Sequence, residues 1–210
     1  MTMLPILLVG AGGHARSCID VIEQEGRFDV TGLLGTVAEI GSSVLGYPVV
    51  GSDAELEAMG AKARHAIVGV GQIKTPDIRM QLFQRLESGG WELPVLVSPR
   101  AYVSPHASLG PGTIVMHGAA INAGAIVGRN CILNSMALVE HDAVVADHCH
   151  IATAATVNGG AKVGEGSFVG SGAVIQQGAE IGRRCVIGMG QNVLADCHDG
   201  SWMPDSARPK

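Results

Sequence analysis

Hydrophobic residues in the second half of the chain recur with a strict period of six. From residue 103, an aliphatic side chain stands at every sixth position, at Val103, Leu109, Val115, Ile121, Val127, Leu133, Val139, Val145, Ile151, Val157, Val163, Val169, Ile175, Ile181, Ile187 and Val193. Four residues after most of them comes a small residue, often with Gly immediately before it, as at Gly112, Gly118, Gly124, Gly160, Gly166, Gly172 and Gly178. We interpret each unit as one short strand and one corner. The aliphatic residue points inward, the small residue fits the tight interior, and Gly supplies the positive φ of the turn.

Three such units close a triangular coil, so the repeat predicts about five coils stacked at a strand spacing of about 4.8 Å. The pattern resembles the hexapeptide repeat of the left-handed parallel β-helix over residues 103–195. Cys131, Cys149 and Cys185 stand at the small interior position, where a thiol is inert core filler. Cys18 and Cys197 lie outside the repeat. Five cysteines without a framework spacing indicate a reducing compartment, and we expect a cytoplasmic protein.

The first half of the chain has the pattern of an α/β domain. Apolar runs predict buried strands at residues 6–9, 30–34, 66–70 and 94–97, and helical periodicity predicts helices at 15–24 and 78–87. We therefore expect an N-terminal Rossmann-like domain at residues 1–98, an all-β left-handed parallel β-helix at 99–200 and a C-terminal tail at 201–210.

Charge and hydropathy exclude two classes of partner. The formal net charge is −5 and the chain has no basic stripe, so a nucleic-acid partner is not expected. The apolar run at residues 4–9 lacks a basic leader and breaks at a glycine loop. It is too short for a signal peptide or a membrane span, so no membrane insertion is expected.

A glycine loop joins the first predicted strand to the first predicted helix. Gly10, Gly12 and Gly13 fit the G-x-G-x-x-G/A pattern, and backbone N–H groups at such a helix start favour an anion, typically a phosphate. NAD binding requires a carboxylate near the end of the second strand, whereas Gly35 and Thr36 stand there. We expect a phosphate-bearing ligand other than NAD, with His14 placed to touch it. The alternative is a tight turn alone, with His14 on the surface.

Three histidines lie within ten residues of an apolar run, at His141, His148 and His150. His141 is two positions after an interior residue, so its side chain projects outward from a corner, and Glu140 and Asp142 flank it. An outward imidazole beside a carboxylate is a good general base, and either acid is a candidate partner.

Each histidine also has to be weighed as a metal ligand, a structural residue or a surface residue. A zinc site is the rival hypothesis, but the three occupy different positions of the hexad and point in different directions. His150 is as consistent with structure as with function, and His148 is expected on the surface. The remaining histidines with no supporting constellation are expected in solvent: His65, His106, His117 and His198.

Both halves together resemble the bacterial sugar acetyltransferases typified by the bacillosamine-pathway N-acetyltransferase and the sialic acid O-acetyltransferases. The resemblance covers essentially the whole chain. It is carried by VGAGGHA, by LNSMALVEHDAVVADHCHIATAATVNGG, and by FVGSGAVI with IGMGQNV. It implies an acetyl-CoA-dependent acyltransferase, a nucleotide-linked amino sugar as substrate, a role in cell-surface glycan biosynthesis, and a homotrimer with active sites between subunits. No metal is implied.

The resemblance also implies roles for particular residues. His141 would be the base and Asp142 would raise its basicity. The implied acetyl-CoA-binding residues are His150, Gly170, Ser171, Gly188 and Met189. The implied substrate-binding residues are Gly12, Gly13 and His14 for the sugar nucleotide, Asn134 for the sugar, and Gly35 and Thr36, which stand where the family often has two aspartates at the nucleoside.

Three hypotheses remain open. The first is N-acetylation of a nucleotide-linked 4-amino-4,6-dideoxy sugar, with O-acetylation of a sialic-type sugar as its runner-up. The second is a metalloenzyme of the γ-carbonic anhydrase class. The third is a non-catalytic binding protein. The sequence leaves open whether the nucleotide is UDP or GDP. It also has extra residues at 72–77, a loop that could reshape the sugar pocket.

Overall fold

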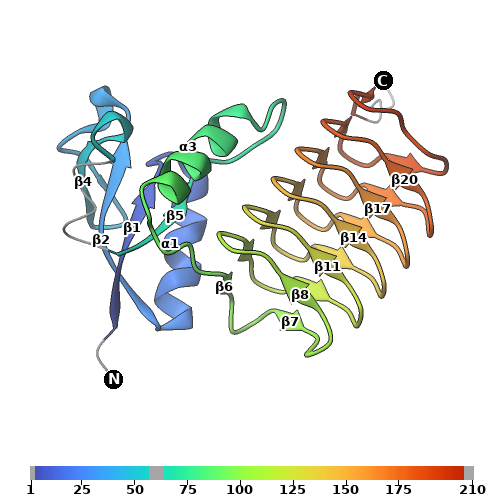
Figure 1. Cartoon of the computed structure of the whole chain (residues 1–210), viewed down its shortest axis with the longest axis horizontal. Helices are drawn as coiled ribbons and strands as arrows, with labels where there is room; N and C mark the ends of the chain where they lie inside the picture. Colours follow the sequence, from blue (N-terminus) through green and yellow to red (C-terminus); the bar gives the residue numbers. More distant parts are fainter. Residues whose placement is uncertain (1–2, 57–63, 206–210) are drawn as a thin grey trace.

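The computed structural model describes residues 3–56 and 64–205 as an α/β domain beside a triangular β-helix (Figure 1). The sheet of the N-terminal domain has the order β3-β4-β2-β1-β5. Its elements are β1 (Leu4–Val9), α1 (Gly13–Glu25), β2 (Phe28–Gly35), the 3-10 turn η1 (Val37–Glu39), β3 (Ser43–Val44), β4 (Tyr47–Ser52), the 3-10 turn η2 (Asp53–Glu55), β5 (His65–Val68) and α3 (Asp77–Ser88). The strands predicted at 6–9, 30–34 and 66–70 and both predicted helices are confirmed.

Two differences concern the strands of this domain. The sequence analysis missed β3 and β4, a hairpin whose turn has two residues in the left-handed region, Leu45 (φ 51°) and Gly46 (φ 90°). The strand predicted at 94–97 exists as β6 (Leu96–Val97), but assigning it to the α/β domain was wrong. It pairs in parallel with β9, so the β-helix begins before residue 98.

The β-helix has three parallel sheets, one on each face of a prism. The face packed against the N-terminal domain, here called the domain-covered face, comprises β6, β9 (Ile114–Val115), β12 (Ile132–Leu133), β15 (His150–Ile151), β18 (Phe168–Val169), β21 (Val186–Ile187) and β23 (Trp202–Met203). The uncharged face comprises β7 (Tyr102–Val103), β10 (Ala120–Ile121), β13 (Leu138–Val139), β16 (Thr156–Val157), β19 (Val174–Ile175) and β22 (Asn192–Val193). The charged face comprises β8 (Ser108–Leu109), β11 (Ile126–Val127), β14 (Val144–Val145), β17 (Lys162–Val163) and β20 (Glu180–Ile181).

The hexad interpretation is confirmed in detail. Most of the recurring aliphatic residues and the small residues that follow them are buried in one core, which includes Cys131, Cys149 and Cys185. Each of the seven glycines predicted at corners has a positive φ, between 65° and 77°. Each corner therefore turns through the left-handed region, where a residue without a Cβ meets no steric penalty.

Five consecutive corners lack that glycine. Asn130, Met136, Asp142, His148 and Ala154 adopt φ values of 52–61° in its place. A non-glycine residue in this conformation costs about 1–2 kcal/mol. Three of the five side chains make specific contacts that offset the cost: Asn130 and His148 hold the two domains together, and Asp142 contacts His141.

Buried polar groups join the domains. Arg79 of α3 is fully buried and donates hydrogen bonds to the Asn130 side chain at 2.7 Å and to the Val68 carbonyl at 2.9 Å. Asn130 lies 2.9 Å from Nδ1 of His148, whose ring packs edge-on against Phe83. His148 is 6% exposed, so the expectation of a surface histidine was wrong. The corner is sheltered because α3 packs over it.

A second polar link joins α1 to the β-helix. His117 contacts Asp20 through Nε2 at 2.7 Å and Ser98 through Nδ1 at 2.6 Å. His65 pairs with Glu92 at 2.9 Å, and its side chain is only 12% exposed. The sequence analysis wrongly expected both histidines to be solvated, because their partners lie far away in the chain.

The end of the β-helix is closed by aspartates. Asp196, Asp199 and Asp205 accept hydrogen bonds from backbone N–H groups of the last coils, at Glu180, Arg183 and Met189. The segment predicted as a tail begins with β23, which pairs with β21. Residues 206–210 lie outside the described residues. Across the part of the chain that the structure describes, no helix is long and apolar enough to cross a membrane.

Candidate active site

His141 stands on an exposed corner between the uncharged and charged faces, here called the His141 edge. Its Nδ1 lies 2.9 Å from Oδ2 of Asp142, and its ring covers Gly159, where a Cβ would lie 2.7 Å from Nε2. The hydrogen bond that His141 donates to the Asp142 carboxylate raises the pKa of His141. Because the Nδ1 proton is donated to Asp142, Nε2 carries the lone pair in the neutral ring, and it lies over Gly159 in an exposed side chain where it can act as a base.

The Glu140 carboxylate makes hydrogen bonds with other groups of the corner. Its Oε2 accepts a hydrogen bond from Nδ2 of Asn122 at 2.8 Å and one from the backbone N–H of His141 at 3.3 Å. The carboxylate therefore supports the corner rather than the imidazole. Between the two acids that the sequence left open, Asp142 is the partner of the ring.

His14, Asn134 and His150 come together at the domain junction, although they lie far apart in the chain. His150 is 7% exposed and its Nδ1 donates to the Gln72 carbonyl at 2.6 Å, while Nδ2 of Asn134 lies 3.2 Å from its Nε2. The His14 and His150 ring centroids are 6.4 Å apart. Burial lowers the pKa of His150 to about 4 and that of His14 to about 3, with the Arg79 charge adding to both shifts. Both rings are therefore neutral near pH 7.

A pocket of about 320 Å³ lies at the carboxyl ends of β1 and β2. Gly12, Gly35 and Thr36 line it, as the sequence analysis expected of substrate-binding residues; Gly13 and His14 are not among its lining residues. Gly12 caps α1 without a side-chain hydrogen bond, and added Cβ atoms at Gly12 and Gly13 would meet nothing within 4 Å. The loop is therefore open to a ligand, at the position where parallel α/β sheets bind nucleotides.

A carboxylate does lie at the end of the second strand, contrary to the expectation from the sequence. The turn η1 folds back so that Oε2 of Glu39 accepts hydrogen bonds from the Thr36 N–H and hydroxyl, each at 2.8 Å. Glu39 and Asp53 both line the pocket. The spacing Thr-x-x-Glu is a capping box and was the sequence signal that could have located Glu39.

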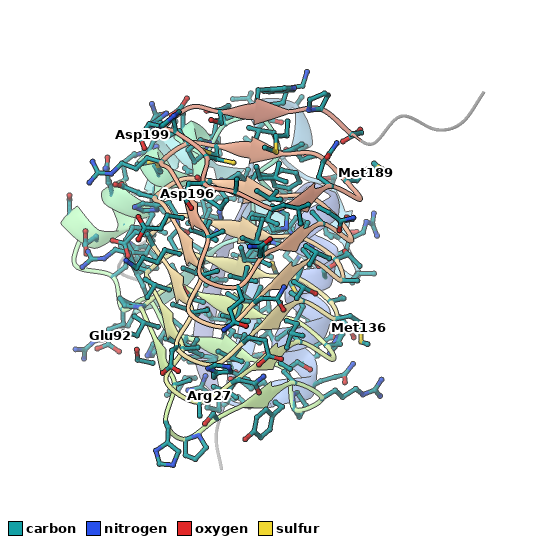
Figure 2. All side chains as sticks on the ribbon, turned by 90° about the vertical axis from the view of Figure 1, so that its right-hand side faces the viewer. Arg27, Glu92, Met136, Met189, Asp196 and Asp199 are labelled. Atoms are coloured by element: carbon teal, nitrogen blue, oxygen red, sulfur yellow. The ribbon has the colours of Figure 1, made fainter. Side chains whose placement is uncertain are left out.

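Four of the residues expected to bind acetyl-CoA lie on another edge of the prism. Gly170, Ser171, Gly188 and Met189 follow β18 and β21, where the domain-covered face turns into the uncharged face. Figure 2 shows Met136 and Met189 on the same side of the molecule. The N–H groups of Gly170 and Gly188 donate to the neighbouring coil, and that of Met189 to Asp205, so these three are already used within the chain.

The His141 edge and this Met189 edge are separated by the whole uncharged face. A single chain therefore does not unite the predicted base with the predicted acetyl-CoA site. His141, His148 and His150 lie at different corners or faces, and no three His, Cys, Asp or Glu side chains within the described ranges are grouped so that they could hold a metal ion.

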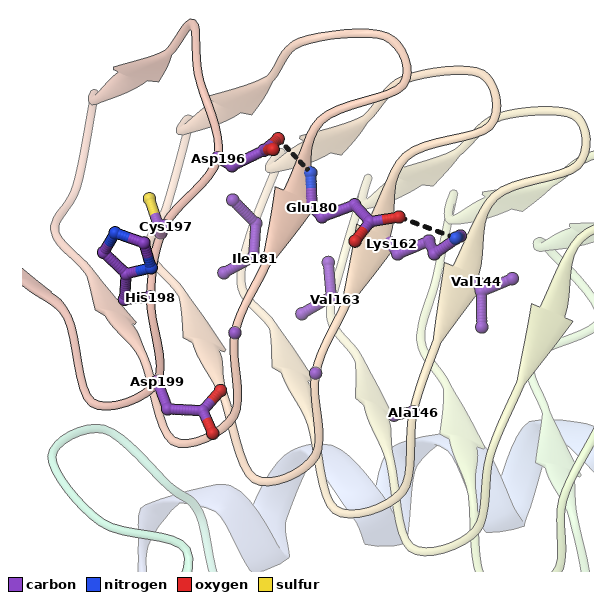
Figure 3. A pocket seen from close by; sticks show the side chains of 12 residues that line it. Val144, Ala146, Lys162, Val163, Glu180, Ile181, Asp196, Cys197, His198 and Asp199 are labelled. Carbon is purple, nitrogen blue, oxygen red and sulfur yellow. Dashed lines mark hydrogen bonds and ion pairs between the residues drawn. The ribbon is translucent and has the colours of Figure 1, made fainter.

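A larger concavity, about 570 Å³, runs along the charged face near its C-terminal end (Figure 3). Lys162 and Glu180 form an exposed ion pair there at 2.7 Å, and Asp196 and Asp199 border it. None of the predicted site residues lines this groove. It is the outer surface of a flat sheet, so we do not assign the site to it.

Comparison with known proteins identifies the family. The model of the PglD N-terminal domain matches residues 5–86, and that of the bacterial transferase hexapeptide repeat matches residues 160–190. A histidine-to-asparagine variant of perosamine N-acetyltransferase from Caulobacter crescentus, solved with CoA and GDP-perosamine, is 32% identical over 96% of this chain and 93% of its own, with a TM-score of 0.89. The acetyltransferase domain of PglB from Neisseria gonorrhoeae, solved with acetyl coenzyme A, is 29% identical over 96% of each chain, with a TM-score of 0.87.

WeeI from Acinetobacter baumannii is 20% identical over 96% of each chain with a TM-score of 0.76, which shows the fold alone. No curated protein sequence matched the chain. The likeness over the full length defines the class: the chain belongs to the hexapeptide-repeat, left-handed β-helix family of sugar N-acetyltransferases. The expected fold and the expected enzyme class, acyltransferase, are thereby confirmed.

Proposed function

We propose that the chain transfers the acetyl group of acetyl-CoA to the amino group of a nucleotide-linked sugar of the 4-amino-4,6-dideoxy type. The observation that carries the proposal is His141, an exposed imidazole with Nδ1 fixed by Asp142 and with Nε2 lying over Gly159, without a hydrogen-bond partner among the described residues. The chemistry of the relatives supports it, since one was solved with CoA and GDP-perosamine and another with acetyl coenzyme A.

The proposed reaction is direct transfer. The neutral sugar amine attacks the thioester carbonyl, and a C–N bond forms while Nε2 of His141 accepts a proton from the nitrogen. The tetrahedral intermediate then expels the CoA sulfur as the C–S bond breaks, and the imidazolium returns the proton to that thiolate. Asp142 stabilises the positive ring between the two steps, consistent with the raised pKa of His141.

The division of the site between two edges supports a homotrimer. The outward residues of the uncharged face carry no formal charge: Tyr102, Ala120, Leu138, Thr156, Val174 and Asn192. Packing this face against neighbours would bring the His141 edge of one subunit to the Met189 edge of the next. Four of the predicted acetyl-CoA contacts, at Gly170, Ser171, Gly188 and Met189, lie on that edge, whereas the fifth, His150, is buried at the domain junction. Light scattering at micromolar concentration tests it, and a monomer would contradict it.

In this proposal the 320 Å³ pocket takes the nucleotide, with Gly12, Gly13 and His14 near the phosphates, Gly35 and Thr36 near the nucleoside, and Asn134 near the sugar. A reaction on an activated sugar also fits the expected cytoplasmic location and a role in glycan synthesis.

The test is thiol release from acetyl-CoA with UDP- and GDP-linked 4-amino-4,6-dideoxy sugars. Replacing a general base should slow turnover by about 10²–10⁴-fold, so we expect that loss in His141→Ala. His106→Ala is the matched control, because His106 is an exposed histidine at a corner of the same edge. Equal turnover by His141→Ala and wild type would remove His141 as the base. Wild-type acetylation of sialic-type hydroxyls, with no turnover of amino sugars, would replace N-acetylation by O-acetylation.

A further inference from the structure

The nucleotide pocket has an unusual charge distribution for a site that must accept a diphosphate. Its lining residues include two acids, Glu39 and Asp53, and no Lys or Arg. Gly10, Ala11 and Gly12 of the glycine loop line the same pocket. A bound nucleotide must therefore place its phosphates at the helix start and present hydrogen-bond donors, not acceptors, to the acids.

Glu39 is held as a fixed acceptor. Its Oε2 accepts two hydrogen bonds from Thr36, which lower the pKa of Glu39 and keep it ionised. An ionised carboxylate accepts about four hydrogen bonds, two at each oxygen, so Thr36 occupies Oε2 and both lone pairs of Oε1 are available to a ligand. No hydrogen bond or ion pair within the described residues engages the Asp53 carboxylate.

Much of the remaining lining of the pocket is apolar. Leu34, Val70, Ile78 and Leu82 line the pocket, and Ile78 is 59% exposed although it is a large aliphatic residue. Aliphatic walls suit the faces of a flat heteroaromatic base, and the fixed carboxylate suits its edge.

Of the common bases, guanine fits this edge. Guanine presents N1–H and N2–H₂ side by side, so both donors would converge on the two lone pairs of Oε1 of Glu39. Uracil presents one N–H between two carbonyl oxygens, and adenine presents a ring acceptor beside its amino group, so each would direct a lone pair at Glu39. We propose that Glu39, with Asp53 beside it, selects a guanosine diphosphate sugar over its uridine counterpart. This inference rests on the proposed function and names its nucleotide.

Calorimetric titration of the full chain with GDP, UDP and ADP tests the selection. A bidentate pair typically discriminates by about 1–3 kcal/mol, so we expect GDP to bind roughly 10–100-fold more tightly than UDP or ADP. Glu39→Gln keeps a carbonyl for the Thr36 capping box but removes the charge, and it should erase most of that preference. Glu55→Gln is the matched control, since Glu55 makes the equivalent box with Ser52 and does not line the pocket.

The results distinguish a failure of guanine selection from a failure of the proposed acetyl transfer. Equal binding of GDP and UDP, or equal losses for both in Glu39→Gln as expected for contacts to ribose, would overturn guanine selection. If the UDP-linked amino sugar is acetylated at least as fast as the GDP-linked sugar, selection fails and acetyl transfer stands. If neither sugar is acetylated but GDP still binds preferentially through Glu39, selection stands and the proposed reaction fails.

Discussion

Replacing Arg79 by Met should strongly destabilise the junction between the two domains. The guanidinium donates to the carbonyls of Val68, at 2.9 Å, and of Val70, at 2.5 Å, and to Asn130 through its carbonyl at 3.1 Å and its side chain at 2.7 Å. Met has a comparable apolar stem but no donor. Four acceptors in a fully buried region would lose this partner.

The magnitude follows from two opposing effects. A buried acceptor left unsatisfied costs about 1–3 kcal/mol, so four of them set an upper limit near 4–12 kcal/mol. Removing a buried charge recovers part of this, because burial disfavours the charged guanidinium and lowers the pKa of Arg79 to about 10. Breaking buried charged networks by removing one partner typically costs about 3–5 kcal/mol, and we expect a loss in that range. It would be a large part of a typical stability of about 5–15 kcal/mol.

Equilibrium unfolding in urea, followed by tryptophan fluorescence, measures the loss. The chain has two tryptophans: Trp91 is buried in the N-terminal core and Trp202 is exposed on the last coil. A Trp202→Phe background therefore makes the signal report the N-terminal domain. Protein concentration must be held constant, since assembly contributes to stability.

Two further variants serve as a control and as an intermediate case for Arg79→Met. Arg16→Met removes an exposed arginine and should change stability by less than about 0.5 kcal/mol. Arg79→Lys keeps the charge but loses the planar fork, so its loss should be intermediate. A loss below about 1 kcal/mol in Arg79→Met would refute the reasoning that this network holds the junction.

Three other predictions concern the histidines. Asp142→Asn removes the main cause of the raised pKa of His141, so the rise of kcat/KM with pH should move to lower pH, and the plateau should fall by more than about tenfold; an unmoved profile would contradict this. Gly159→Ala places a Cβ 2.7 Å from Nε2 of His141 and should abolish turnover without changing the urea midpoint; an active variant would show that the ring lies elsewhere. The pKa of His150 is about 4 in the folded chain and near 6.5 in the unfolded chain. The contribution of the neutral, buried ring to the free energy of unfolding is therefore complete above pH 6.5 and is lost as pH falls toward 4, by about 2 kcal/mol at pH 5. His150→Gln should remove that part of the decrease in the free energy of unfolding at acid pH, measured by urea unfolding.

Much of the β-helix could be predicted because its determinants are local. Each hexad repeats the same demand: an aliphatic residue inside, a small residue at the corner and a left-handed turn. The outward direction of His141 followed from its position two residues after Val139. For the same reason the pattern predicted the interior places of the cysteines correctly, without any knowledge of how the coils stack.

The expectations that proved wrong concern residues whose partners are remote in the chain or are brought close by a turn. His148 and His117 were expected in solvent because their partners, on α3 and α1, are remote in the chain. Glu39 was overlooked because a 3-10 turn brings it back to the end of β2. β6 was assigned to the wrong domain because its partner β9 follows some eighteen residues later, in the register of the β-helix.

The sequence by itself determined the hexad core, the α/β order of the first half, the glycine loop and the outward, acid-flanked His141. These depend on periodicity and turn chemistry within a few residues. Only the tertiary structure decided that Asp142 rather than Glu140 holds the imidazole, that His14, Asn134 and His150 meet at the junction, and that Glu39 lines the pocket at the carboxyl ends of β1 and β2. It also decided that the predicted base and the edge predicted to bind acetyl-CoA lie on opposite sides of the uncharged face. The physical reason is that hydrogen-bond partners, burial and pKa shifts depend on neighbours in space, which local patterns do not specify.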